Sequence, residues 1–167
     1  MESIIVIHTK EFKYHKRVSH LLTTVLLKNQ INSQILDISS GKEDHEYFFF
    51  LQDANVDFII DFDMVGFRFQ TEGNESSYTT LPCRIAVLLF NKASLYHSSL
   101  GERMNFSTFL YCRNQDDRDT VLRKYTNVPN ICNMDQLELM EQSDFIDREN
   151  LAKLTLLVHK IIMDICI

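Results

Sequence analysis

Two carboxylates lie at the end of an apolar run in the first half of the chain. Asp61 and Asp63 are separated by one residue and end the run 57–62, which is typical of a buried strand. Residues i and i+2 of an extended chain lie on the same side, so both carboxylates are expected to point the same way. Carboxylate oxygens are ligands that Mg²⁺ and Mn²⁺ prefer. Asp61 and Asp63 are therefore a candidate metal site, and a strand-end carboxylate beside a turn carboxylate is the alternative.

Basic and imidazole side chains gather after the first apolar run, 3–7. Cations in the first turn of a helix oppose the helix dipole unless an anion lies nearby, and a helix N-terminus favours phosphate or carboxylate. The glycines of a GxGxxG or Walker A loop are absent from the sequence. The candidate anion- or ligand-binding residues are His8, Thr9, Lys10, Lys16 and Arg17. A solvated basic loop is the alternative.

The sequence contains no other familiar catalytic or metal-binding pattern. Its six histidines include no HExxH pair, and no GxSxG elbow is present. Its four cysteines include no CxxC pair, which argues against a zinc site and predicts reduced core thiols. We therefore assign no catalytic residue and no firm cofactor from the sequence.

Strands and helices alternate along the part of the chain that must position these residues. Short β-branched runs predict strands, and apolar residues at helical spacing predict helices between them. The predicted strands are 3–7, 33–38 and 57–62, and the predicted helices are 15–30 and 43–54. This βαβαβ succession predicts a parallel sheet with right-handed crossovers.

The second half continues the pattern less regularly. Residues 64–78 predict an extended excursion, and 79–90 predict a helix, with a strand as the alternative because 85–90 is apolar all round. Further along, we expect a strand at 106–112 and a helix at 115–125. A short strand at 128–132 and a helical C-terminal segment at 134–167 follow. The fold class is therefore α/β, a Rossmann-like or flavodoxin-like three-layer sandwich with a parallel sheet of about five strands.

Composition limits the classes of partner. The 167 residues, 45% hydrophobic and 24% charged, are expected to form one globular domain. The net charge of −6 argues against nucleic-acid binding, and the acidic stretch 43–75 is expected to be a solvated face. The chain opens without a basic, apolar leader and has no run long enough to span a membrane, so we expect a cytoplasmic protein without membrane association.

The order of elements resembles the N-terminal Rossmann-like half of GT-B glycosyltransferases, especially the bacterial spore-protein-like group. The segments that carry the resemblance are 56–66 (VDFIIDFDMVG), 78–90 and 106–134. An apolar strand ending in DxD is also how metal-dependent glycosyltransferases hold a nucleotide sugar. In the spore-protein-like family, the donor sugar is bound largely by a C-terminal domain that this sequence does not contain. The resemblance therefore implies a stand-alone, non-catalytic relative and transfers no catalytic residue.

The C-terminal segment predicts a partner helix. Five apolar residues follow the 3-4-3-4 spacing of a helix that packs along another helix, namely Leu151, Leu154, Val158, Ile161 and Ile165. This stripe predicts a homodimer interface, and packing on the chain's own sheet is the alternative.

Two function classes remain after this survey. The first is a ligand-binding or accessory module that takes a small anionic or nucleotide-like ligand. The second is a small metal-dependent enzyme that acts on a nucleotide or phosphorylated substrate through Asp61 and Asp63.

Overall fold

Six parallel strands form the centre of the protein. The computed structural model describes residues 3–9, 12–38, 43–68, 80–91, 104, 107–125, 130–134 and 148–166. The strands are β1 Ser3–His8, β2 Asn32–Asp37, β3 Phe58–Phe62, β4 Arg84–Leu88, β5 Thr108–Cys112 and β6 Asn130–Asn133. They lie in the order β2-β1-β3-β4-β5-β6, and every neighbouring pair is parallel. The predicted α/β fold class is confirmed, with six strands instead of about five.

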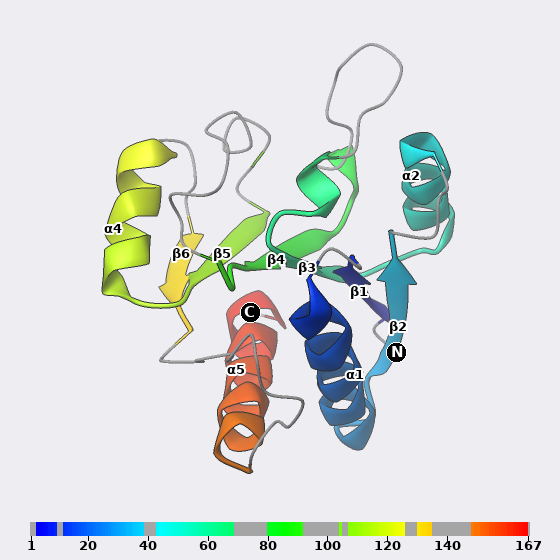
Figure 1. Ribbon diagram of the computed structural model, residues 1–167. Helices are drawn as coiled ribbons and strands as arrows, with labels where there is room; N and C mark the ends of the chain where they lie inside the picture. Colours follow the sequence, from blue (N-terminus) through cyan, green and yellow to red (C-terminus); the bar gives the residue numbers. More distant parts are fainter. Residues whose placement is uncertain are drawn as a thin grey trace.

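Helices cover both faces of the sheet (Figure 1). They are α1 Lys13–Lys28, α2 Asp44–Asp53, α4 Gln115–Lys124 and α5 Arg148–Cys166. Helices α1 and α5 share one face, where Val18, Leu22 and Val158 meet the sheet in one buried cluster. Helices α2 and α4 cover the other face, where Leu51 and Val121 belong to a second cluster. The helices predicted at 15–30, 43–54 and 115–125 are present with slightly shifted ends.

Strand β4 corrects one sequence prediction. Residues 79–90 were predicted as a helix, but Arg84–Leu88 forms β4 between β3 and β5. A strand in the middle of a parallel sheet is covered on both faces, so its apolar residues follow one another without alternation. The same continuous run suits a buried helix, which is why periodicity favoured the wrong element.

The excursion predicted at 64–78 begins differently from the expectation. Gly66–Arg68 is a turn of 3-10 helix, and Val65 and Phe67 are both buried, so their alternation does not mark an extended arm. Asp63 and Met64 have φ angles of 53° and 60°, which turns the chain sharply after β3. Residues 69–79, and likewise 135–147 of the predicted helical C-terminal segment, lie outside the described residues.

The stripe of α5 faces inward, which corrects the predicted dimer interface. Leu154, Val158 and Ile161 are each at most 2% exposed and pack with α1 and the sheet in one cluster. The structure does not describe the side chains of Leu151 and Ile165. One face of the sheet is wide enough to cover two helices, so the apolar spacing serves the core of the domain itself.

Two further features bear on the sequence predictions. Cys83 and Cys112 are buried free thiols, as predicted, and burial raises the pKa of Cys83 to about 11 and that of Cys112 to about 12. Among the described residues, no helix combines the length and the hydrophobicity that a membrane span requires.

Truncation of a core residue on α5 should destabilise the protein far more than truncation of an exposed one. We expect Leu154→Ala to lower the free energy of unfolding by about 2–5 kcal/mol, because it leaves a cavity under the helix. Leu156, on the same helix, is 69% exposed. Leu156→Ala should change stability by less than about 0.5 kcal/mol. Urea denaturation followed by circular dichroism measures both, and equal losses would contradict the packing described for α5.

Candidate functional site

The strand order defines one preferred edge for a ligand. The chain runs from β1 outward to β2 and then returns to the other side of β1 as β3. In open α/β sheets, ligands bind beyond the carboxyl ends of the strands where the order reverses in this way. That switch point lies between the ends of β1 and β3, beside the first turn of α1.

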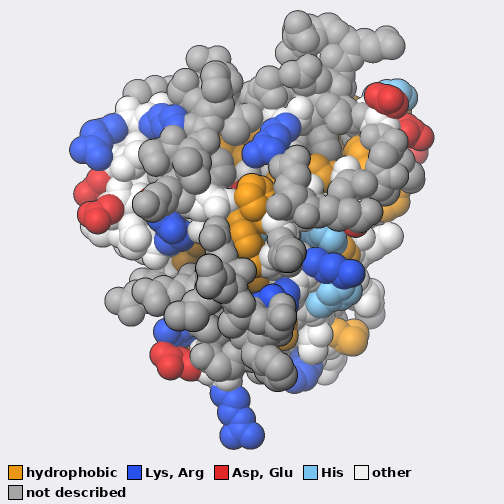
Figure 2. Space-filling model, viewed as in Figure 1, with side chains coloured by type: hydrophobic (Ala, Val, Ile, Leu, Met, Phe, Trp, Pro, Cys, Tyr) orange, Lys and Arg blue, Asp and Glu red, His pale blue; other side chains and the backbone are white. Residues whose placement is uncertain are grey.

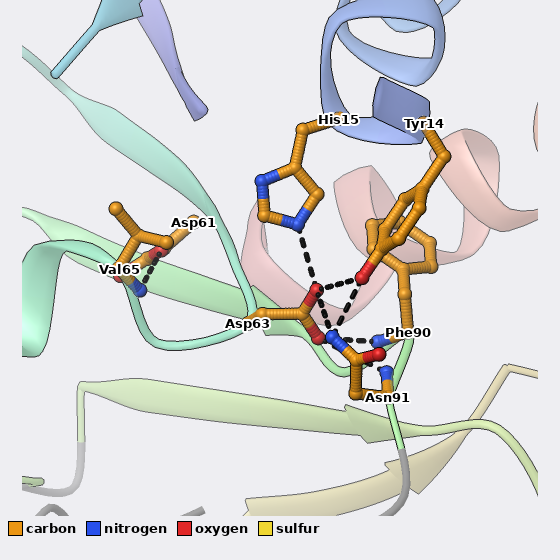
Figure 3. A network of polar contacts seen from close by, with 7 residues as sticks. All are labelled: Tyr14, His15, Asp61, Asp63, Val65, Phe90 and Asn91. Carbon is orange, nitrogen blue, oxygen red and sulfur yellow. Dashed lines mark hydrogen bonds and ion pairs between the residues drawn. The ribbon is translucent and has the colours of Figure 1, made fainter. Parts of the chain in front are cut away.

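A buried carboxylate, Asp63, ties three segments together at this edge (Figure 3). Its Oδ2 accepts from the Tyr14 hydroxyl at 2.7 Å, lies 2.7 Å from His15 Nε2 and accepts from the Asn91 side-chain amide at 3.0 Å. Its Oδ1 accepts the backbone N–H groups of Phe90 at 2.7 Å and Asn91 at 3.1 Å. We call Tyr14, His15, Asp63, Phe90 and Asn91 the Asp63 cluster.

The backbone explains why Asp63 can reach these groups. Its own N–H donates to Leu88 O at 2.9 Å, which continues the β3–β4 ladder by one residue. Its φ of 53° then leaves the strand geometry, and aspartate tolerates this left-handed region better than most residues. The side chain therefore turns toward α1 and the end of β4.

Five donors on one carboxylate leave little capacity for another ligand. A buried charge is stable only when paired and hydrogen-bonded, and Asp63 is fully buried with both oxygens engaged. The Asn91 side chain also donates to the Tyr14 hydroxyl at 2.6 Å, so the cluster closes on itself. Asp63 thus joins α1 to the sheet.

His15 presents one ring nitrogen to Asp63 and leaves the other without a partner. With Nε2 donating to the carboxylate, Nδ1 is left as an acceptor, and it is buried with no hydrogen bond. The ring packs edge-on to Tyr14 and Phe62, which fix its orientation. Figure 3 shows Nδ1 on the side of the ring turned away from Asp63. An imidazole oriented by a carboxylate in this way can accept a hydrogen bond or a proton from a ligand.

His8, at the end of β1, is a second buried imidazole with an unpartnered nitrogen. The residue is 4% exposed, and its Nδ1 has no hydrogen bond. Burial lowers the pKa of His8 and the neighbouring His15 and His20 act in the same direction, whereas the nearby Asp37 and a hydrogen bond with the Thr9 backbone oppose the shift. His8 ends β1 and His15 lies in the first turn of the helix that follows, so both lie at the same end of the sheet. Two imidazole nitrogens without partners therefore lie at the switch point.

The first turn of α1 supplies the rest of the predicted anion site. Its N-cap residue, Phe12, provides no side-chain cap, and the turn holds no acidic residue. Lys16 is exposed and Arg17 half-buried, whereas Thr9 is buried. Lys10 lies outside the described residues. Figure 2 shows Lys or Arg side chains beside His side chains on this face of the molecule.

The structure assigns Asp61 and Asp63 to different partners. Asp61 accepts the backbone N–H of Val65 at 2.9 Å and that of Gly66 at 3.0 Å, so it closes the turn after β3. The expectation of one shared direction is wrong, because Asp63 lies past the strand end in a left-handed conformation. Among the described residues, no group of three or more His, Cys, Asp or Glu side chains is placed to hold a metal ion.

The sequence survey did not select Tyr14, His15, Phe90 or Asn91 as site residues. Asn91 lies three residues after the end of β4, so the rule that ligands bind beyond strand ends indicates it once 84–88 is known to be a strand. Tyr14 and His15 join the site through contacts with a residue about 50 positions away, which no local pattern signals.

Comparison with known proteins gives one distant structural likeness. No protein-family model matches the chain, and no curated protein matches it. Among solved structures, the chain is similar to the crystal structure of a flavodoxin-like domain from Synechococcus sp., with 10% identity, a TM-score of 0.48 and 99% of each chain covered. At this distance the likeness carries no argument about function, and the fold class rests on the strand order itself.

Neutralising Asp63 should cost more stability than neutralising any exposed aspartate. Asp63→Asn replaces one acceptor oxygen by a donor amide and leaves buried donors unpaired, which should lower the free energy of unfolding by about 3–5 kcal/mol. Asp53→Asn, at the exposed end of α2, is the matched control and should have almost no effect. Urea titrations of both variants make the comparison. A loss below about 1 kcal/mol for Asp63→Asn would contradict the role assigned to the cluster.

Burial of His8 predicts a pH dependence of stability with a definite sign. The folded pKa of His8 lies below its ordinary value of 6.5, so the unfolded chain binds the proton more readily. The free energy of unfolding should therefore fall as the pH drops below that ordinary value, and this contribution should level off below the folded pKa.

The variant His8→Gln removes this titration. Thermal or urea denaturation should be measured from about pH 7.5 to about pH 5, a range that brackets the ordinary pKa of histidine. The free energy of unfolding should decline less steeply with falling pH in His8→Gln than in the wild type. His45→Gln, at an exposed position on α2, is the control. An unchanged slope in His8→Gln would refute the assignment.

Proposed function

We propose that this protein is a ligand-binding or accessory module, related to the N-terminal half of GT-B glycosyltransferases, that binds a small anionic ligand at the carboxyl ends of β1 and β3. The observation that carries the proposal is the pair of buried imidazoles, His8 and His15, whose Nδ1 atoms lack partners beside the uncapped first turn of α1. Buried polar atoms in native proteins are nearly always satisfied, so unpartnered ones at a predicted ligand edge indicate a missing group.

Charge and helix geometry indicate that the ligand is an anion. The first N–H groups of α1 have no side-chain cap, and no acidic side chain occupies the first turn. Lys16 lies at the end of the first turn and Arg17 follows it, and both are at least partly accessible. Such a helix start is favourable for a phosphate or carboxylate, which the adjacent cations stabilise further.

The imidazole of His15 adds a requirement on the ligand. Because Nε2–H donates to the Asp63 carboxylate, Nδ1 of the neutral ring is an acceptor and is satisfied by a donor such as a hydroxyl. A phosphorylated or nucleotide-like compound carries both an anionic group and hydroxyls. The proposed ligand class is therefore a hydroxylated phosphate compound. The resemblance to the GT-B N-terminal half supports a module that binds a ligand beside a separate partner domain.

The alternative, a metal-dependent enzyme that uses Asp61 and Asp63, has less support. Both oxygens of Asp61 accept backbone N–H groups, and those of Asp63 accept five donors. A carboxylate committed in this way binds Mg²⁺ or Mn²⁺ only after its hydrogen bonds break. We therefore assign the two aspartates to structure, and the proposed binding needs no metal.

Thermal-shift measurements test the proposal and its alternative together. Inorganic phosphate and a nucleoside diphosphate, each without metal and with Mn²⁺, should stabilise the wild type by about 2.7 kcal/mol at a hundredfold excess over Kd. The gain should not depend on Mn²⁺. A shift that requires Mn²⁺ and disappears in Asp61→Asn would contradict the proposal and favour the enzyme.

A matched pair of double variants separates specific binding from general salt effects. Lys16→Ala with Arg17→Ala removes two cations from the site, whereas Arg123→Ala with Lys124→Ala removes two from the last turn of α4. Anions that are excluded from protein surfaces stabilise folded proteins in general, so both double variants should keep this nonspecific stabilisation. Only the first pair should lose the ligand-dependent shift, and equal shifts in both pairs would overturn the anion site.

A further inference from the structure

A second group of polar side chains lies at the carboxyl ends of the last two strands. Asn133 is the final residue of β6, and Gln115 opens α4 three residues after the end of β5. Helix α4 packs against both strands, on the opposite face of the sheet from α5 (Figure 1). We call Gln115, Arg118, Asn133 and Lys160 the β6 cluster. Because every strand runs in the same direction, the β6 cluster lies on the same edge of the sheet as His8.

A chain of hydrogen bonds fixes the orientation of the Asn133 amide. Gln115 Nε2 donates to Asp119 Oδ1 at 2.8 Å, and an ionised carboxylate only accepts hydrogen bonds. Gln115 Oε1 is therefore the atom that accepts from Asn133 Nδ2, at 3.3 Å. The other amide atom of Asn133, Oδ1, is buried without a hydrogen-bond partner. A buried acceptor without a donor is unfavourable, so a donor is expected beside this atom.

Arg118 carries a donor without an acceptor on the same side of α4. It lies three residues after Gln115, a spacing that makes two side chains neighbours on a helix. Its Nε is buried without a hydrogen-bond partner, and among the described residues no carboxylate forms an ion pair with its guanidinium. Asp117, the preceding residue, accepts instead from Arg113 Nε at 2.6 Å. The β6 cluster therefore contains one buried donor and one buried acceptor that lack their complements.

Lys160 reaches the end of β6 from the opposite face of the sheet. Its Nζ donates to the backbone oxygen of Asn133 at 3.0 Å. Burial raises the pKa of the neighbouring Cys132 thiol, and Asp164 acts in the same direction. Lys160 and Arg118 oppose that shift. The positive charge of two side chains therefore acts on the end of β6 and favours an electron-rich ligand atom there.

We propose that the β6 cluster binds the base of a nucleotide whose phosphate lies at the first turn of α1. The ligand must offer an acceptor to Arg118 Nε and a donor to Asn133 Oδ1. Adenine presents the two side by side, with N7 as the acceptor and the N6 amino group as the donor. A simple anion offers acceptors alone. The inference rests on the proposed function and narrows the ligand from a hydroxylated phosphate compound to a nucleotide.

The strand order separates the two ends of such a ligand by a suitable length. Strand β6 lies three positions from β3, which corresponds to ~14 Å at the usual spacing of neighbouring strands. The sugar of a nucleotide lies between its base and its phosphate, so an extended nucleotide runs along this edge past β4 and β5. The hydroxyls of that sugar can supply the donor that His15 Nδ1 lacks.

Isothermal titration calorimetry with adenosine monophosphate and with ribose phosphate tests the base contact, because the second compound lacks the base. The wild type should bind adenosine monophosphate at least about tenfold more tightly, which is the gain expected from a base held by a paired donor and acceptor. An analogue whose amino group carries two methyl groups has no N–H to donate to Asn133. It should lose most of that gain.

Two variants and a matched control assign the gain to the β6 cluster. Arg118→Met keeps an apolar stem and removes the donor, and Asn133→Ala removes the acceptor. Each should reduce the affinity for adenosine monophosphate to that for ribose phosphate, with an unaltered circular dichroism spectrum. Arg123→Met, at an exposed position in the last turn of α4, should change neither affinity.

The outcomes separate this inference from the proposed function. Equal affinities of the wild type for the two compounds overturn the inference and leave the proposed function intact, and a trapped water then satisfies the two buried atoms. A preference for adenosine monophosphate that persists in both Arg118→Met and Asn133→Ala also overturns the inference. A wild type that binds neither compound overturns the proposed function as well.

Discussion

The carboxylate of Asp63 is the contact on which the candidate site depends. It joins the first turn of α1, the end of β3 and the residues after β4, and it is buried with five hydrogen-bond donors around it. An unpaired charge in this position would be strongly destabilising, so the three segments must be placed together for the fold to be stable. The same bonds fix the ring of His15. Structure and binding chemistry are thus linked through one side chain.

This linkage separates two roles at the carboxyl edge of the sheet. The aspartates hold the framework: Asp61 closes the turn after β3, and Asp63 attaches α1. The imidazoles of His8 and His15 have no such framework role on their second nitrogen, since each keeps a buried Nδ1 without a hydrogen-bond partner. The proposed anion site therefore places no demand on the two aspartates, which serve the framework.

Sequence patterns predicted the elements better than the site. The alternation of strands and helices predicted the parallel sheet, since β1 and β3 are short apolar runs and α1 has clear helical periodicity. It misassigned 84–88, because a central strand and a buried helix share a continuous apolar run. His8, Lys16 and Arg17 were selected from their place after the first strand, and their role in binding stays a prediction. Tyr14, His15 and Asn91 were not, because contacts between distant segments bring them to Asp63.

Nitrogen-15 NMR of the His15 ring tests the central claim most directly. The account predicts a proton on Nε2, held by Asp63, and an unprotonated Nδ1 whose resonance moves when inorganic phosphate or a nucleoside diphosphate is added. Selective assignment through His15→Gln identifies the signals. A ring with its proton on Nδ1, or an Nδ1 resonance that ignores both ligands at saturating concentration, would contradict the account.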